Sequence, residues 1–124
     1  MKEIIKTDKA PGAIGPYSQG VRIENLIFTS GQIAINPQTG KISESIEEQT
    51  KQVLENIKEI LEAGGTNINN VIKTTVFLKN MNDFEKMNSI YETYFINEKP
   101  ARSAIEVSRL PKDVKIEIEV IAHI

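Results

Sequence analysis

The sequence contains no cysteine and no tryptophan, and its single histidine, His123, is the penultimate residue. The absence of cysteine excludes disulfides, thiolate zinc sites and cysteine nucleophiles together. A Ser-His-Asp relay would have to pass through His123, although terminal residues are usually loosely held. Glu117 and Glu119 alone do not make a metal site, so none is expected. What remains for chemistry is arginine, carboxylates, hydroxyls and backbone amides.

Long apolar runs and an excess of basic charge are missing as well. No run approaches the roughly 18 apolar residues of a membrane span, and the N-terminal stretch MKEIIKTDKAPG is too charged for the apolar core of a signal peptide. The net charge of −2 and the pI of about 5.5 argue against the broad basic surface of nucleic-acid-binding proteins. We therefore expect a cytoplasmic protein, with its 124 residues forming one domain, residues 1–124.

The glycine-containing stretch GAIGPYSQG is not a phosphate-binding loop. It lacks the lysine followed by serine or threonine that ends such a loop and contacts the phosphates and the magnesium ion. No cofactor is expected from any other part of the chain.

The hydrophobic pattern predicts five strands and two helices. Ser45 and Glu48 fit a capping box at the start of the first helix, and Gly64-Gly65 fits its end. The predicted order is β-β-α-β-α-β-β, which indicates an α+β fold with two helices packed on one face of a mixed sheet. The predicted elements are a hairpin of strands 21–23 and 26–29 around Glu24-Asn25, helix 46–61, strand 71–78, helix 83–96, and strands 102–108 and 114–122.

The stretch PARSAIEV, residues 100–107, places an arginine near the start of an expected strand. If the last two strands pair as an antiparallel hairpin, Arg102 lies directly opposite Glu117, and Ile105 and Val107 face the core. One interpretation is a cross-strand ion pair, contributing about 0.2–1 kcal/mol. The other is that Arg102 grips the carboxylate of a ligand while Glu117 orients or deprotonates a water molecule. The geometry alone leaves both open.

Two further side chains fit either packing or a pocket. Asn88 shares an otherwise apolar helical stripe with Phe84, Tyr91 and Phe95. A polar residue there is usually a hydrogen-bonded structural residue, but it can also brace a pocket wall. Tyr17, in the stretch GPYSQG, is open to the same two interpretations, because a ring with a polar tip suits both.

A series of short motifs extends nearly from end to end of the chain. Together, in this order and at this spacing, they resemble the RidA family, also called YjgF/YER057c/UK114. The motifs are AIGPYSQG (13–20), FTSGQ (28–32), NPQTG (36–40), QVLENI (52–57), AGG (63–65), VIKTTVFL (71–78), PARS (100–103), RLPK (109–112) and IEIE (116–119).

The resemblance implies a chorismate-mutase-like α+β fold and a homotrimer with clefts between the subunits. It also implies hydrolysis of reactive enamine and imine intermediates, such as 2-aminoacrylate and 2-aminocrotonate, to 2-keto acids and ammonia. Pyridoxal-phosphate-dependent dehydratases release such intermediates, and the deaminase itself needs no cofactor. By resemblance, Arg102 binds the substrate carboxylate and Glu117 positions or activates the water, while the residues that line or support the cleft are Tyr17, Ser30, Gly31 and Asn88.

Ala104 stands where members of this family often have a cysteine. If the thiol of that cysteine were an essential nucleophile, this protein, which has alanine instead, would be inactive. We expect instead that only the backbone carbonyl matters there, as a water ligand, and alanine retains it.

Other functions stay open beside the deaminase. A non-enzymatic regulator that binds 2-keto acids would use the same cleft residues, and only turnover separates it from the enzyme. An endoribonuclease or translation inhibitor, reported for some relatives, would need acid and base groups and a basic RNA path, which one terminal histidine and a net charge of −2 do not supply. The sequence gives no indication for or against a chaperone role.

Overall fold

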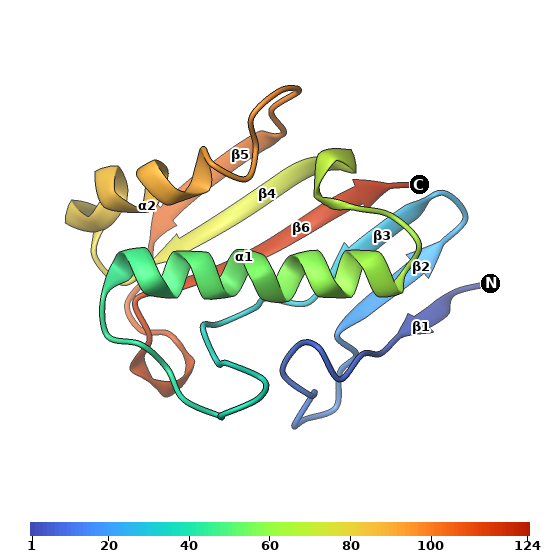
Figure 1. Cartoon of the computed structure of the whole chain (residues 1–124), viewed down its shortest axis with the longest axis horizontal. Coiled ribbons are helices and arrows are strands. Elements are labelled where there is room, and N and C mark those ends of the chain that lie inside the picture. Colours follow the sequence, from blue (N-terminus) through green and yellow to red (C-terminus); the bar gives the residue numbers. More distant parts are fainter.

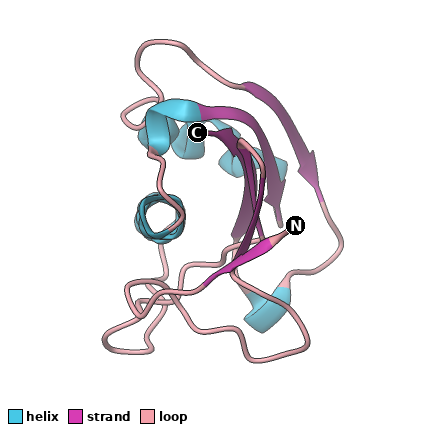
Figure 2. Ribbon diagram, turned by 90° about the vertical axis from the view of Figure 1, so that its right-hand side faces the viewer, coloured by secondary structure: helices cyan, strands magenta, loops and turns pink.

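A six-stranded mixed sheet carries both α-helices on one face (Figure 1). The structure is a computed structural model that describes all residues, 1–124. The strand order is β1-β2-β3-β6-β4-β5, and Figure 2 shows the long helix α1, seen end-on, on one side of the curved sheet. The elements are β1 (Glu3–Ile5), β2 (Gly20–Ile23), β3 (Leu26–Thr29), α1 (Ile46–Ala63), η1 (Ile68–Asn70), β4 (Val71–Leu78), η2 (Met81–Asp83), α2 (Phe84–Tyr91), β5 (Ala101–Glu106), η3 (Pro111–Asp113) and β6 (Ile116–His123). The predicted α+β fold is confirmed, and β1 is the one strand that the pattern missed.

Helix α1 begins and ends as the sequence predicts. The Ser45 hydroxyl accepts a hydrogen bond from the backbone N–H of Glu48 at 3.1 Å, which caps the first turn. At the other end Gly65 adopts a positive φ of 95°, and the N–H of Thr66 donates to the carbonyl of Leu61 at 3.0 Å. This is a Schellman motif, which favours glycine at the left-handed position. The helix packs on the sheet through buried residues that include Val53, Leu54, Ile57, Ile60 and Leu61.

The predicted hairpin is present as β2 and β3. Ile23 pairs with Leu26, so Glu24 and Asn25 form the two-residue turn. Glu24 has a φ of 51°, the left-handed conformation that two-residue hairpin turns use. Strand β3 then pairs with β6, which places the C-terminal strand in the middle of the sheet.

The predicted antiparallel pairing of the last two strands is wrong. Strand β5 pairs in parallel with β4, and β4 lies between β5 and β6. Arg102 is therefore in register with Thr74, whereas Glu117 is in register with Phe77. The reason is the connection: α2 lies between β4 and β5 and provides the crossover that a parallel pair requires. The edge of β6 that β5 would need is already occupied by β4.

The new register also reverses the face on which Arg102 lies. Thr74 is fully buried under the helices, and Arg102, in register with it, lies on that same helix-covered face. Ile105, predicted to face the core, is 45% exposed on the open face of the sheet. Val107 lies just after β5 and is half-buried. On β6 the alternation is as predicted, with Ile116, Ile118, Val120 and Ala122 buried on the helix side.

Helix α2 is shorter than predicted, since it ends at Tyr91 and the prediction extended it to residue 96. After Tyr91 the backbone tightens: the N–H of Thr93 donates to the carbonyl of Ile90 at 3.0 Å, three residues back. The Thr93 hydroxyl donates to the same carbonyl and competes for it. Phe95 is still buried and packs on Tyr91, so the apolar side of the segment was predicted correctly.

The sheet face opposite the helices is open and partly apolar. Its exposed hydrophobic residues are Ile4, Ile23, Leu26, Phe28 and Ile105. An apolar surface of this kind often marks an interaction site.

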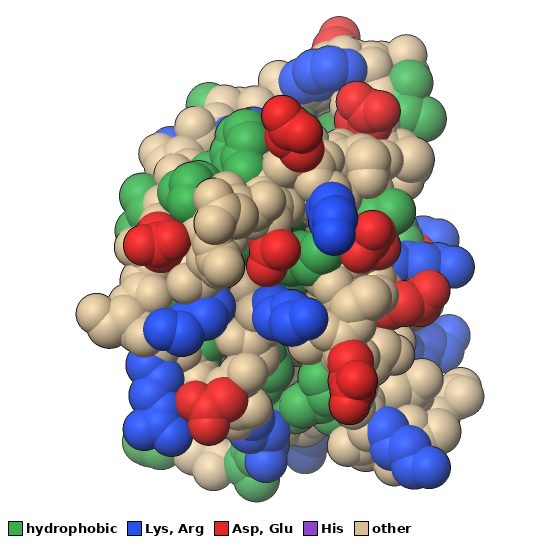
Figure 3. Space-filling model, turned by 90° about the vertical axis from the view of Figure 1, so that its left-hand side faces the viewer, with side chains coloured by type: hydrophobic (Ala, Val, Ile, Leu, Met, Phe, Trp, Pro, Cys, Tyr) green, Lys and Arg blue, Asp and Glu red, His purple; other side chains and the backbone are tan.

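No helix is both long and apolar enough to cross a membrane. On the side seen in Figure 3, acidic and basic side chains are interspersed, without a continuous basic track.

Candidate active site

The side chain of Arg102 lies against one stripe of α2. Residues 84, 88 and 91 are spaced by four and three, so they lie on one face of the helix. The guanidinium carbon is 5.3 Å from the centroid of the Phe84 ring and 4.8 Å from that of Tyr91. Between the rings, Asn88 Oδ1 accepts a hydrogen bond from Arg102 Nη1 at 2.7 Å. Two cation–π contacts and a hydrogen bond therefore fix the guanidinium.

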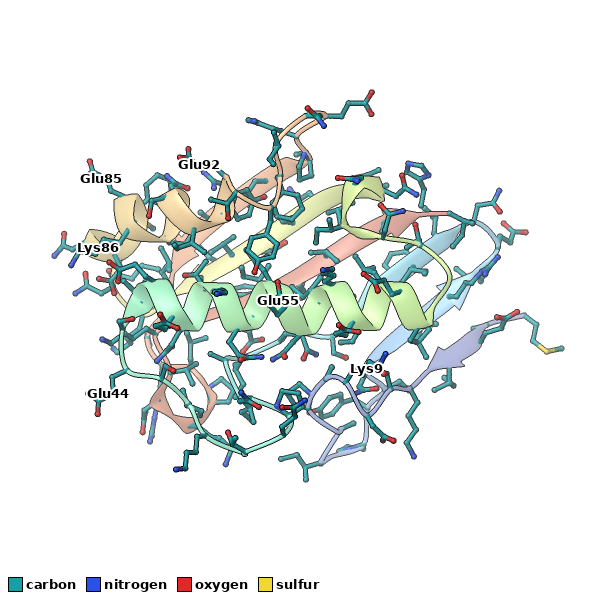
Figure 4. All side chains as sticks on the ribbon, in the orientation of Figure 1. Lys9, Glu44, Glu55, Glu85, Lys86 and Glu92 are labelled. Carbon is teal, nitrogen blue, oxygen red and sulfur yellow. The ribbon has the colours of Figure 1, made fainter.

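No carboxylate pairs with Arg102. The one ion pair in the structure joins Arg109 to Asp113, both of them exposed side chains in the segment after β5. Arg102 lines a cavity of about 450 Å³ together with Asn88, Tyr91, Glu92, Phe95, Lys99 and Pro100. Figure 4 shows Glu92 at the outer edge of α2, pointing away from α1. A half-buried, oriented cation without an anionic partner is suited to bind the carboxylate of a ligand.

Glu117 lies on the open face of the sheet, against the backbone of Gly31. A Cβ added at Gly31 would be 2.0 Å from Glu117 Oε2, so only glycine leaves room for the carboxylate in this position. Burial raises the pKa of Glu117, and the nearby charge of Glu119 raises it further. The carboxylate is therefore a stronger base than an ordinary glutamate.

Tyr17 and Ser30 lie beside the segment that holds Gly31. Tyr17 is 52% exposed and lines a cavity of about 130 Å³ together with Gly31, Gln32 and Pro111. The Ser30 hydroxyl donates to the carbonyl of Ser18, and the Ser30 N–H donates to the carbonyl of Gln19 at 2.9 Å. These bonds tie the Tyr17 loop to the end of β3.

Ala104 lies two residues after Arg102 on the same face of β5. Its side chain is half-buried and packs against the hydrophobic core. Its position in β5 is in register with Val76 of β4. The methyl group is thus part of the packing under the helices.

The predicted site residues therefore form two groups on opposite faces of the sheet. Arg102, Asn88 and Ala104 belong to the helix-covered side, whereas Glu117 extends from the open side and lies against Gly31. The direct opposition of Arg102 and Glu117 predicted from the sequence is absent. Within one chain, the arginine and the glutamate cannot act on the same small ligand.

The sequence did not predict three residues around Arg102. Phe84 and Tyr91 contact its guanidinium, and Thr74 is hydrogen-bonded to Tyr91. Phe84 and Tyr91 were assigned to the apolar side of α2, which is correct, but their contact with Arg102 was not anticipated. The signal was present in the spacing of Phe84, Asn88 and Tyr91, a stripe with aromatic rings on both sides of an amide. Pairing it with Arg102 required the parallel register of β4 and β5.

The chain as a whole matches one protein family. The model described as Endoribonuclease L-PSP matches residues 7–124. The chain therefore belongs to this family, which includes the RidA/YjgF proteins.

Individual relatives match along nearly their whole length. A RutC family protein of Pyrococcus horikoshii is 61% identical over 124 residues, which cover 99% of this chain and 98% of the relative. The 2-iminobutanoate/2-iminopropanoate deaminase of Escherichia coli K12 is 52% identical over 125 residues, covering 98% of each chain. The crystal structure of E. coli TdcF with bound serine superposes with a TM-score of 0.96 at 48% identity, covering 98% of both chains.

Proposed function

We propose that this protein is a hydrolytic deaminase of 2-imino acids, which it converts to 2-keto acids and ammonia. The substrates are enamine and imine intermediates of the 2-aminoacrylate and 2-aminocrotonate type, released by pyridoxal-phosphate-dependent dehydratases. The observation that carries the proposal is Arg102, a guanidinium fixed by Asn88 and two aromatic rings and left without a carboxylate partner. The E. coli relative named as a 2-iminobutanoate/2-iminopropanoate deaminase supports the same reaction.

The chemistry requires little beyond positioning. The fork of Arg102 binds the carboxylate of the imino acid at two points, which fixes the C=N carbon. The Glu117 carboxylate accepts a proton from a water molecule as the water oxygen attacks that carbon. Glu117 returns this proton to the nitrogen of the resulting carbinolamine. The nitrogen then leaves as ammonia while the carbinolamine hydroxyl loses its proton to Glu117, which leaves the 2-keto acid. Since imines of this kind hydrolyse unaided, orientation and a base suffice without a covalent intermediate.

The two groups of residues come together when copies of the chain associate. We propose a homotrimer in which Arg102 and Asn88 of one subunit share a cleft with Glu117, Gly31 and Tyr17 of its neighbour. Two features support this arrangement: the groups lie on opposite faces of the sheet, and the open face is partly apolar. A cyclic trimer gives every cleft one residue group from each of two subunits.

Turnover of an imino acid tests the proposal directly. A threonine or serine dehydratase generates the imine in place, and semicarbazide traps what is not hydrolysed. We expect the protein to lower the semicarbazone signal in proportion to its concentration, and Arg102→Ala to abolish that effect. An unchanged signal with both imines would refute the deaminase and leave a binding site for 2-keto acids.

Mixing two inactive variants tests the shared cleft. Arg102→Ala and Glu117→Gln each remove one half of every cleft. When equal amounts are unfolded and refolded together, about a quarter of the clefts combine an intact arginine with an intact glutamate, given random assembly of a cyclic trimer. We expect activity to return to about that fraction of the wild-type value. No recovery in a refolded mixture that contains trimers would contradict the intersubunit cleft.

A further inference from the structure

Two side-chain hydrogen bonds join α2 to the sheet, and both start from one rung of it. The first is the bond from Arg102 to Asn88. The second joins the hydroxyl groups of Thr74 and Tyr91, which are 2.7 Å apart. Thr74 on β4 and Arg102 on β5 are in register, so the two bonds arise side by side. The helix is thereby fixed at the rung that carries the arginine.

The Thr74–Tyr91 bond is not explained by packing alone. Thr74 is fully buried and Tyr91 is 7% exposed. Buried hydroxyl groups cost stability unless they are paired, and valine with phenylalanine would fill nearly the same space without polar atoms. What the hydroxyl pair adds is a defined orientation of α2 on the sheet. An eight-residue helix is too short to hold its own position, so its orientation depends on contacts of this kind.

The ring of Tyr91 links the hydroxyl pair to Arg102, because it is bonded to Thr74 at its tip and contacts the guanidinium with its face. One side of the ring is near the guanidinium carbon, 4.8 Å from the ring centroid, and Phe95 packs at 4.6 Å between ring centroids. Thr74 fixes the tip of the ring. A tyrosine phenol is protonated at neutral pH, and burial raises the pKa of Tyr91 further, so its hydroxyl can donate or accept in this bond. The ring therefore cannot turn without losing a contact at its tip or on its face.

We propose that Thr74 and Tyr91 are positioning residues for the carboxylate-binding arginine. Their hydroxyl pair sets the orientation of the Tyr91 ring, and the ring sets the direction of the Arg102 fork toward the ligand. The proposal rests on the proposed function, since it deepens the role of Arg102 in binding the carboxylate of an imino acid.

Removing either hydroxyl tests the proposal. Tyr91→Phe keeps the ring, and Thr74→Val keeps the volume, but each breaks the same bond. Arg102 binds the carboxylate in both the ground state and the transition state, so the loss falls on KM. We expect KM to rise about 3- to 10-fold and kcat to stay within about twofold in each variant. The double variant should equal either single variant, because one bond is lost in all three.

A conservative change and two controls separate positioning from packing. Thr74→Ser keeps the hydroxyl and loses a methyl group, so we expect a lower Tm with an unchanged KM. Thr50→Val removes a buried hydroxyl that bonds to the carbonyl of Ile46 within α1, and Tyr94→Phe removes a phenol that bonds to Glu55. We expect both control variants to keep the wild-type KM.

Binding of 2-oxobutanoate separates failure of this proposal from failure of the proposed function. Its dissociation constant is measured by calorimetry or NMR titration of the full chain, without turnover. If the wild type binds 2-oxobutanoate but hydrolyses no imine, the deaminase is refuted, and a weaker affinity in Tyr91→Phe and Thr74→Val still supports positioning. Wild-type affinity and KM in both variants would overturn it. So would a wild-type protein that neither binds 2-oxobutanoate nor hydrolyses imines.

Discussion

Replacing Gly31 by alanine should strongly lower kcat while leaving the fold intact. The added Cβ would be 2.0 Å from Glu117 Oε2 and 2.8 Å from the carboxyl carbon. Gly31 has no positive φ, so alanine is allowed by the backbone. The neighbour that must give way is the end of a flexible side chain. The substitution therefore acts on the position of the carboxylate and not on the core.

The size of the effect follows from the displacement. Restoring an ordinary contact of 3.4 Å or more moves the carboxylate oxygen by more than an ångström. A misplacement of about 1 Å at a reacting group can cost on the order of 10²-fold in rate. We expect kcat for imine hydrolysis, measured by semicarbazide trapping, to fall by about that factor. Since no packed core atom has to move, we expect Tm to stay within about 2 °C of the wild-type value.

A matched glycine provides the control. At Gly12 an added Cβ has nothing within 4 Å, and the residue has no positive φ. Gly12→Ala should therefore leave both kcat and Tm unchanged. If Gly31→Ala kept wild-type kcat, the placement of the Glu117 carboxylate over Gly31 would be irrelevant to the reaction, and the proposed base would be wrong.

Three further predictions concern pH and stability. Activity needs the ionised form of Glu117, whose pKa is raised by burial and then by Glu119, so kcat should fall on acidification at a higher pH than for an ordinary glutamate. Glu119→Gln should shift this acid limb of the pH–rate profile to lower pH, and a shift to higher pH would contradict the assignment. Leu54→Ala, at a fully buried position, should cost about 2–5 kcal/mol in urea unfolding. Ser45→Ala removes the cap of α1 and should cost about 1 kcal/mol, whereas an unchanged urea midpoint would mean that the cap contributes nothing.

Local structure was predictable from the sequence because local residues determine it. The cap at Ser45, the left-handed Gly65 and the two-residue turn at Glu24 each depend on a few neighbouring residues, and all three are present. Strand β1 was missed because three residues with two adjacent isoleucines carry no usable alternation. Its pairing with β2 depends on residues that lie far along the chain.

Strand neighbours were not predictable in the same way. The last two strands are adjacent in sequence, and the predicted short loop between them favours a hairpin. In the structure residues 107–115, which include η3, connect the two strands, and β4 lies between them in the sheet. Alternation in PARSAIEV correctly placed Arg102 and Ala104 on one face, but it could not say which face meets the helices. Which face meets the helices depends on the crossover through α2 and on the contacts of the Phe84 and Tyr91 rings with the guanidinium.

The corrected register strengthens the case for Arg102 as a ligand-binding residue. In the predicted hairpin its charge would have been neutralised by Glu117, and an ion pair would have explained it fully. In the structure the two lie on opposite faces, and the arginine is held by neutral groups only: an amide oxygen and two aromatic rings. Half-burying a guanidinium without a counter-charge costs free energy. A bound carboxylate supplies the missing charge, which is why the arrangement is better suited to bind an anion than to stabilise the fold.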